Sequence, residues 1–170
     1  YHFLLKGKRM PLAPYDGGVV EYTIQGSGPA LVLVHGTGQT AENTWSDLSR
    51  RFTDCRTAIC PNYSGPGKTT DNGEPLTLVG LAEQVVAAAE HAGVERFDLA
   101  GHSLGSCVAM AVAAAYPEKV DRLVLIAGFL SAADARMQMQ FRIWQELAVS
   151  NPRMLAELFL YAAFSPAFLT

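Results

Sequence analysis

Apolar residues along the chain fall into short runs, which are separated by longer stretches with helical spacing. Four mainly apolar runs predict strands buried within a sheet, at 30–34, 57–60, 96–100 and 123–127. A further run, 19–24, alternates as a strand does, and apolar residues recur at helical spacing in 43–52, 78–91 and 104–116. Because strands alternate with helices, the pattern predicts an α/β fold, a mostly parallel sheet with helices on both faces.

Several residues predict where these elements begin and end. Asn43 or Thr44 is expected to cap the first helix, and Thr77 the second. Gly93 suits the position just after the second helix, where a positive φ is common. Pro61 is expected to end the strand at 57–60.

The character of the chain changes after Gly128. Two helices with mixed faces and many large apolar groups are predicted at 131–150 and 152–164, and no further strand follows them. We therefore divide the chain into an N-terminal tail or first strand (1–15), an α/β core (16–130) and a helical segment (131–170).

Composition narrows the class of protein. The 170 residues include 13 Lys and Arg against 16 Asp and Glu, and 49% are hydrophobic, which excludes intrinsic disorder. An isoelectric point near 5.8 argues against a nucleic-acid partner. No apolar stretch approaches the ~20 residues of a membrane span, so no membrane partner is expected. Three cysteines suit a reducing, cytoplasmic setting, and no Cys/His spacing predicts a metal site.

The pentapeptide Gly101-His102-Ser103-Leu104-Gly105 carries the candidate chemistry. It has the form G-x-S-x-G and stands between a predicted strand and a predicted helix, as a nucleophile elbow does. Glycines are needed there because side chains would clash in so tight a turn. The alternative is a glycine-rich turn of another α/β fold with an incidental serine.

A second motif, His35-Gly36-Thr37-Gly38, follows the strand at 30–34. Acyl transfer needs two backbone N–H groups aimed at the oxygen that becomes negative in the transition state. Thr37 and Leu104, the residue after the nucleophile, are the expected donors of this oxyanion hole. A plain turn at the end of a strand is the alternative.

Together, residues 31–36, 61–69 and 99–105 resemble the α/β-hydrolase superfamily, and in particular its cap-bearing serine hydrolases. The likeness covers about residues 16–130. It implies an eight-stranded sheet, a Ser–His–acid triad with Ser103 as nucleophile, no cofactor, and a helical cap insertion beginning near residue 131. Family members often have Asp-x-Arg-Gly where this chain has Asn62-Tyr63-Ser64-Gly65, so a charge pair is lost.

The general base is not evident in the sequence. The family order is Ser, acid, His, yet all four histidines precede Ser103: His2, His35, His91 and His102. None is expected to be the base. Asp134, after the strand at 123–127, is a candidate for the acid, although a later strand is the commoner place.

The candidate substrate pocket combines both motifs with the helical segment, namely His35, Gly36, His102, Phe141, Trp144 and Phe164. For the last three, packing between helices is the more common role of such residues. The sequence predicts a serine hydrolase that cleaves an ester, thioester, lactone or related small acyl substrate through an acyl-enzyme. The alternatives are a carbon–carbon bond hydrolase, a cyclase, or an idle homologue that binds a small ligand. The functional protein is expected to include the remainder of the fold, in the same or a second polypeptide.

Overall fold

The computed structural model describes residues 10–168. Most of the expected N-terminal tail, together with His2, lies outside the described residues. The chain divides into two compact units, Tyr1–Phe129 and Leu130–Thr170. Each unit is described by itself.

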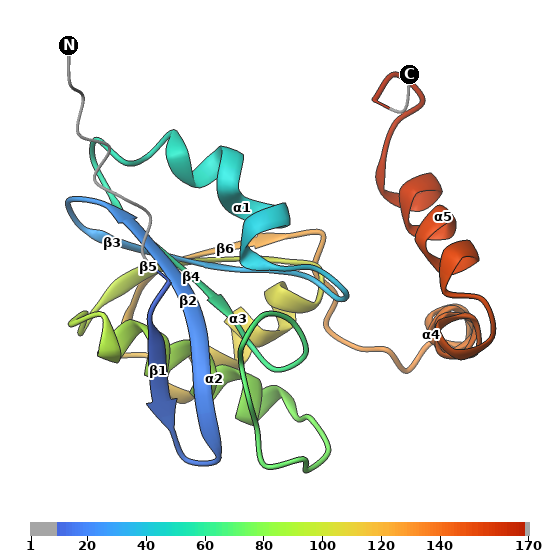
Figure 1. Ribbon diagram of the computed structural model, residues 1–170, viewed down its shortest axis with the longest axis horizontal. Coiled ribbons are helices and arrows are strands. Elements are labelled where there is room, and N and C mark those ends of the chain that lie inside the picture. The colour runs from blue at the N-terminus through green and yellow to red at the C-terminus, as the bar shows by residue number, and fades with distance from the viewer. Residues whose placement is uncertain (1–9, 169–170) are drawn as a thin grey trace. The chain divides into compact units, whose positions relative to one another are not determined.

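The first unit is built on a single sheet (Figure 1). Its strands are β1 (Leu12–Tyr15), β2 (Gly18–Gly26), β3 (Ala30–Val34), β4 (Thr57–Asn62), β5 (Phe97–His102) and β6 (Val120–Ile126). They lie in the order β1-β2-β4-β3-β5-β6. Strands β1 and β2 are antiparallel to their neighbours, whereas β4, β3, β5 and β6 are parallel. The predicted α/β class with a mostly parallel sheet is therefore confirmed.

Three helices cover the two faces of this sheet. Helix α1 (Ala41–Arg50) packs on one face, against β2, β3 and β4. Helices α2 (Leu78–His91) and α3 (Leu104–Ala115) lie side by side on the other face (Figure 1). This arrangement places the carboxyl ends of β3 and β5 at the same edge of the sheet, because parallel strands all run one way.

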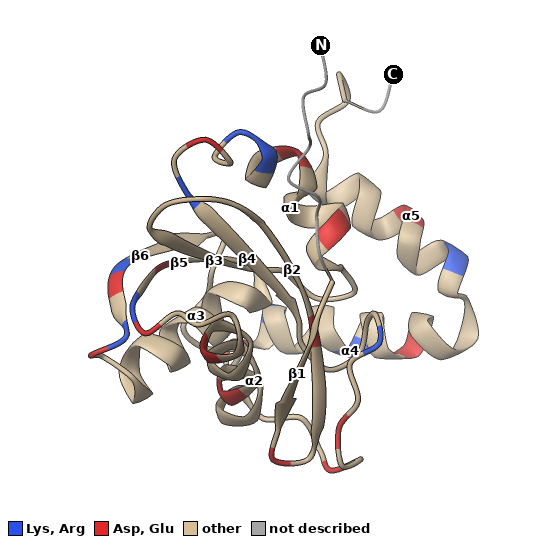
Figure 2. Ribbon diagram, turned by 60° about the vertical axis from the view of Figure 1, so that its left-hand side comes forward, with Lys and Arg blue, Asp and Glu red and all other residues tan. Residues whose placement is uncertain are grey.

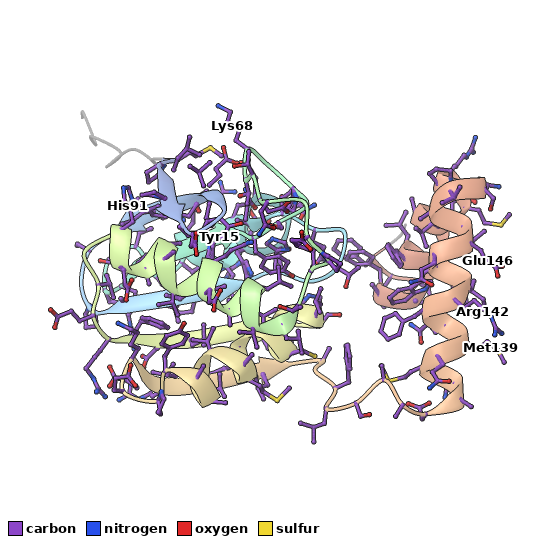
Figure 3. The ribbon with its side chains drawn as sticks, turned by 90° about the horizontal axis from the view of Figure 1, so that it is seen from below. Tyr15, Lys68, His91, Met139, Arg142 and Glu146 are labelled. Carbon is purple, nitrogen blue, oxygen red and sulfur yellow. The ribbon has the colours of Figure 1, made fainter. Side chains whose placement is uncertain are left out.

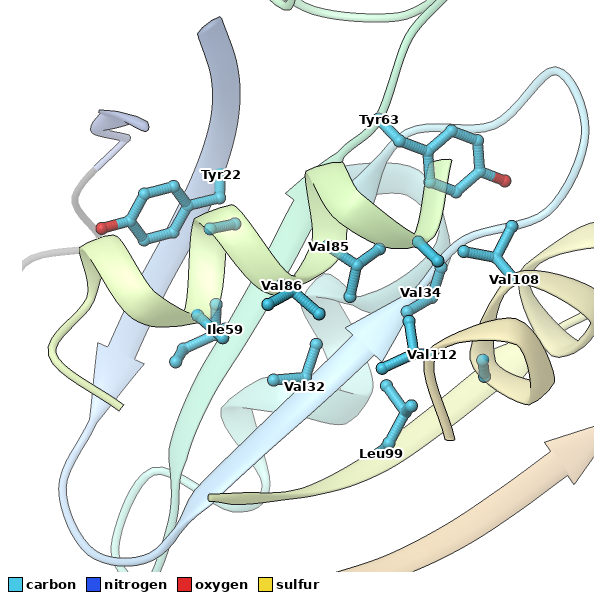
Figure 4. Packing of buried hydrophobic residues seen from close by; sticks show 14 of the residues in the cluster. Tyr22, Val32, Val34, Ile59, Tyr63, Val85, Val86, Leu99, Val108 and Val112 are labelled. Carbon is cyan, nitrogen blue, oxygen red and sulfur yellow. The ribbon is translucent and has the colours of Figure 1, made fainter. Parts of the chain in front are cut away.

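The larger core cluster fills the space between the sheet and helices α2 and α3 (Figure 4). Valines of the two helices pack against apolar residues of the strands there. The helix residues are Val85, Val86, Val108 and Val112, and the strand residues are Val32, Val34, Ile59 and Leu99. Alternation along β3 sends Leu33 to the opposite face, into a smaller cluster with Trp45 of α1. Burial of each such side chain contributes about 1.5–3 kcal/mol, so these two layers hold the ends of β3 and β5 firmly.

The prediction that Pro61 ends its strand is wrong, because β4 continues through it to Asn62. Strand β3 pairs with β4 only as far as Ile59. Beyond that point β4 has β2 as its remaining neighbour, and Pro61 lies opposite Tyr22. A proline without an N–H group is tolerated at such a place, since no ladder bond on the β3 side is lost.

The prediction of Asn43 or Thr44 as the cap of the first helix is also wrong. Helix α1 begins at Ala41, and Thr40 is its N-cap. The Thr40 hydroxyl accepts from the Asn43 N–H at 3.1 Å, while the Asn43 side-chain oxygen accepts from the Thr40 N–H at 2.8 Å. This is a reciprocal capping box, in which Asn43 is the third helical residue.

The boundaries of the second helix are confirmed. Thr77 caps α2 by accepting from the Gly80 N–H at 3.0 Å, and Gly93 follows the helix with φ +78°. Strand β5 ends two residues later than predicted, because Gly101 and His102 still pair with β6. The strand therefore leads directly into Ser103.

The second unit contains α4 (Ala135–Ser150) and α5 (Pro152–Ala163), close to the two predicted helices. Trp144 of α4 makes edge-to-face contacts with Phe141 at 5.4 Å and with Phe159 of α5 at 4.8 Å. Met139, Arg142 and Glu146 lie along α4 (Figure 3). None of the described helices is long and apolar enough to cross a membrane.

Candidate active site

Ser103 lies at the junction between β5 and α3 with an unusual backbone conformation. It is the N-cap residue of α3, with φ 55° and ψ −120°, and its side chain caps no helical N–H. A non-glycine residue with positive φ is uncommon, and such strain costs about 1–3 kcal/mol where the surroundings impose it. The predicted order of strand, sharp turn and helix is confirmed at this serine.

The two flanking glycines are required by close approach of the backbone. A Cβ atom on Gly101 would lie 2.1 Å from the carbonyl oxygen of Gly105. A Cβ on Gly105 would lie 2.3 Å from the carbonyl oxygen of Val34, at the end of β3. Real Cβ contacts are never this short, so helix α3 can approach β3 and β5 only through glycine.

Ser106 fastens the turn to β6. This fully buried residue places its hydroxyl 2.7 Å from the Gly101 carbonyl oxygen and 2.9 Å from that of Ile126. The Ser103 N–H also donates to the Ile126 carbonyl, at 2.9 Å. Sequence reasoning missed Ser106, although a small polar residue in the first turn of a buried helix is a signal for such a role.

The loop after β3 lies beside Ser103. A Cβ on Gly36 would be 3.2 Å from both the Ser103 Cβ and His102 Nδ1. The Gly36 carbonyl accepts from His35 Nδ1 at 2.9 Å and from the Gln39 N–H at 3.4 Å. Because a trans peptide is planar, the Thr37 N–H must point the opposite way from that carbonyl.

The two expected oxyanion donors, the N–H groups of Thr37 and Leu104, have no hydrogen-bond acceptor within the described part of the chain. Leu104 is the first residue of α3, so its N–H has no partner within the helix. Neither this N–H nor that of Thr37 makes a hydrogen bond to a described residue, and Thr37 is exposed. That both N–H groups point toward one oxygen position stays a prediction.

His35 is buried beside this loop. Its ring stacks on Tyr63 with centroids 4.1 Å apart, and the Tyr63 hydroxyl donates to the His35 carbonyl at 2.6 Å. Burial lowers the pKa of His35, although its hydrogen bond to Gly36 opposes this shift. Burial, with the nearby Cys107 thiol, raises the pKa of Tyr63, so the hydroxyl stays a donor. His35 therefore supports the loop as a neutral ring whose Nδ1 carries the proton.

The other two described histidines also have partners away from the Ser103 hydroxyl. His91, at the end of α2 (Figure 3), lies with Nδ1 3.0 Å from the Tyr22 hydroxyl. His102 Nδ1 lies 3.2 Å from Gln39 Oε1. Within residues 10–168 the Ser103 hydroxyl has no hydrogen-bond partner.

The remaining candidates belong to the second unit. Asp134 caps α4 by accepting from the Met137 N–H at 3.0 Å. Phe141 and Trp144 contact each other, and Phe164 stacks on Phe168 at 4.5 Å. The structure thus brings His35, Gly36, Thr37, His102, Ser103 and Leu104 together in the first unit, and gives the other four candidates contacts within their own unit.

Comparison with known proteins agrees with the resemblance to the α/β-hydrolase superfamily. The family model of the α/β-hydrolase fold matches residues 29–168. Pyrrolizixenacetamide deacetylase from Xenorhabdus hominickii is 48% identical over 151 residues, which are 89% of this chain and 57% of that protein. The chain therefore spans little more than half the length of this curated relative.

Two solved structures resemble the chain. A Pseudomonas aeruginosa protein assigned as an epoxide hydrolase has a TM-score of 0.80 with 20% identity, over 99% of this chain and 64% of that one. At this identity the likeness concerns the fold alone. A bacterial membrane phospholipase A has a TM-score of 0.70 with 28% identity, over 81% of this chain and 46% of that one.

Proposed function

The chain belongs to the α/β-hydrolase family, and we propose that it carries the nucleophile and the oxyanion hole of a serine hydrolase. The observation that supports this most strongly is the strained backbone of Ser103, φ 55° and ψ −120°, between two glycines that admit no side chain. Such strain persists only where the surroundings impose it, and it exposes the serine hydroxyl at the edge of the sheet. A structural serine would need neither feature.

In the proposed reaction, the Ser103 oxygen attacks the acyl carbon of the substrate while a base takes its proton. The carbonyl oxygen becomes negative and is held by the N–H groups of Thr37 and Leu104. The dipole of α3, whose N-terminus lies at this point, favours the same charge. Expulsion of the leaving group forms an acyl-enzyme, which water then hydrolyses.

We place the general base in the part of the protein outside residues 1–170. The three described histidines are engaged with Gly36, Tyr22 and Gln39, and the chain spans 57% of the length of the deacetylase. The acid is proposed to lie there as well. Asp134 is the weaker candidate, because its carboxylate already caps α4.

The proposed substrate is a small carboxylic acid derivative, cleaved at its acyl–oxygen or acyl–nitrogen bond. The 48% identical relative is named as a deacetylase of an acetamide, which supports transfer of a short acyl group. The helical unit is proposed to be the beginning of a cap, as in the cap-bearing enzymes that the sequence resembles.

A labelling experiment tests the nucleophile. A fluorophosphonate probe should modify the full-length protein at Ser103, and the Ser103→Ala variant should not be labelled. Hydrolysis of p-nitrophenyl acetate and of an aryl acetamide should fall by about 10⁴-fold in that variant, as is typical for loss of a triad member. Ser27→Ala, in an exposed turn of the same unit, is the matched control and should behave as the wild type. Labelling of Ser103→Ala at the wild-type rate would refute the assignment.

A further inference from the structure

Gln39 stands at the centre of the polar contacts beside Ser103. Its side-chain oxygen Oε1 accepts from the Gly36 N–H at 3.0 Å and from the Thr44 hydroxyl at 3.2 Å, and lies 3.2 Å from His102 Nδ1. These partners come from three places: the loop after β3, the first helical turn of α1, and the residue before the nucleophile. A single carbonyl oxygen thus joins the loop after β3 and the start of α1, which are neighbours in the sequence, to His102, which is 63 residues away.

The chemistry of these contacts settles the orientation of the amide. The backbone N–H of Gly36 can only donate, so the atom that faces it must be the carbonyl oxygen of Gln39. The same oxygen can only accept, so His102 Nδ1 must carry a proton. In the neutral ring of His102 the lone pair is therefore on Nε2.

Gln39 also holds the Gly36 residue from both sides. Its side chain accepts from the Gly36 N–H, and its own backbone N–H donates to the Gly36 carbonyl at 3.4 Å. This carbonyl belongs to the peptide that ends in the Thr37 N–H. Because the peptide is planar, the Thr37 N–H points away from this carbonyl, which the Gln39 backbone N–H holds together with His35 Nδ1 at 2.9 Å.

We infer that Gln39 is a positioning residue, whose side-chain oxygen holds both Gly36, the residue before Thr37, and His102, the residue before Ser103, through one shared acceptor. The inference rests on the proposed function, because it assigns to Gln39 the support of the oxyanion hole. Gln39 itself contacts no reacting atom. Its removal should leave substrate binding intact and weaken the stabilisation of the transition state.

The variant Gln39→Met tests this in the full-length protein, since it keeps the length of the side chain and removes the acceptor. We expect kcat for p-nitrophenyl acetate to fall about 10- to 100-fold, because misplacement of a catalytic group by about 1 Å has effects of this size. KM should stay within about 2-fold, as for an interaction made only in the transition state. Gln25→Met removes a comparable glutamine, which donates to Ser49, and should leave both constants unchanged.

A second readout does not depend on activity. Nitrogen-15 NMR of the imidazole rings should show wild-type His102 with its proton on Nδ1. In Gln39→Met the proton should shift toward Nε2, while Gln25→Met should leave the tautomer as it is. The wild-type spectrum alone decides this point if Gln39→Met does not fold.

The outcomes separate the two proposals. Wild-type kcat in Gln39→Met, a change confined to KM, or a proton on Nε2 in wild-type His102 would each overturn the role of Gln39. So would a fall in kcat with an unchanged tautomer, because the shared acceptor would then not be the cause. Absence of fluorophosphonate labelling at Ser103 would overturn the proposed function instead, and the NMR result would still report on the contact between Gln39 and His102.

Discussion

The two ends of the parallel strands differ in whether their polar groups are paired. At the carboxyl ends of β3 and β5, the backbone is strained at Ser103, and the N–H groups of Thr37 and Leu104 have no partner in the described structure. At the amino ends, charged residues gather around β5 and β6 (Figure 2). Asp98 there lies 2.7 Å from Arg56 and 3.5 Å from Arg122.

If the carboxyl end holds the active site, as we propose, charge is a poor guide to its position in this molecule. The amino end carries more ionised groups, yet they are paired with one another and mostly reached by water, so their fields are screened. The carboxyl end carries few charges but holds unpaired donors in a rigid backbone. Donors fixed in advance can stabilise a transition-state oxyanion without reorganisation, and this is the property that catalysis requires.

The largest effect on stability is expected from Gly105→Ala, which adds a methyl group where α3 approaches the carboxyl end of β3. In Gly105→Ala the new Cβ would lie 2.3 Å from the Val34 carbonyl oxygen and 2.4 Å from that of His35. Both are backbone atoms of the core strand and its end, so the helix must move away. We expect the free energy of unfolding, measured in urea, to fall by about 3 kcal/mol, at the upper end of the usual cost of overpacking.

Gly73→Ala is the matched control for this change. Gly73 has φ +77°, and nothing lies within 4 Å of the position of its Cβ. The substitution should therefore cost only the conformational strain, about 1 kcal/mol. Equal losses in the two variants would show that the contact between α3 and β3 is not tight, and would remove the basis for the strain at Ser103.

The fold was predictable because it follows from local patterns. Apolar runs and helical spacing located β3 and α2 to the residue, since burial on both faces of a strand and on one face of a helix leaves a periodic trace. The errors are equally local. Pro61 was expected to end β4, and only the pairing of β3 with β4, which stops at Ile59, decides that it does not.

The residues of the candidate site were predictable only where they belong to a sequence motif. G-x-S-x-G located Ser103, because steric limits on the turn force glycine at fixed positions. Gln39 and Ser106 leave no such trace, since their partners come from other elements. The same holds for Asn62, which was expected to mark a lost charge pair. Its amide group donates to the buried carboxylate of Glu21 at 3.1 Å and accepts from the Ala41 N–H at 2.7 Å, two contacts that the lost charge pair did not suggest.

A smaller effect on stability is expected when the backbone strain at Ser103 is relieved. Glycine adopts a positive φ readily, so Ser103→Gly should be more stable than Ser103→Ala by about 1 kcal/mol in calorimetric unfolding. Both variants lack the nucleophile and should be equally inactive. The two substitutions therefore separate the energetic cost of the backbone at this position from the chemistry of the hydroxyl. A Ser103→Gly protein less stable than Ser103→Ala would mean that the backbone there is not strained.

The smallest effect is expected at the opposite end, in the ion pair between Arg96 and Asp121. Arg96 Nε donates to the Asp121 carboxylate at 2.9 Å, but the two side chains are 58% and 45% exposed. A double-mutant cycle with Arg96→Ala and Asp121→Ala should give a coupling free energy of about 0.5 kcal/mol, as is typical of exposed pairs. This coupling should shrink further in 1 M salt, where the Debye length is about 3 Å.

The variants of the same cycle should have unchanged catalytic constants, and this tests whether the two ends of the strands are independent. The pair joins the amino ends of β5 and β6, whereas Ser103 follows the carboxyl end of β5. Because the buried core residues of β5 lie between these points, loss of the pair should not move the turn at Ser103. We therefore expect kcat and KM for p-nitrophenyl acetate to stay within about 2-fold of the wild type in all three variants, as for additive, distant sites. A fall of 10-fold or more in kcat would mean that the ion pairs at the amino end reach the active end through β5, and that the two ends are not independent.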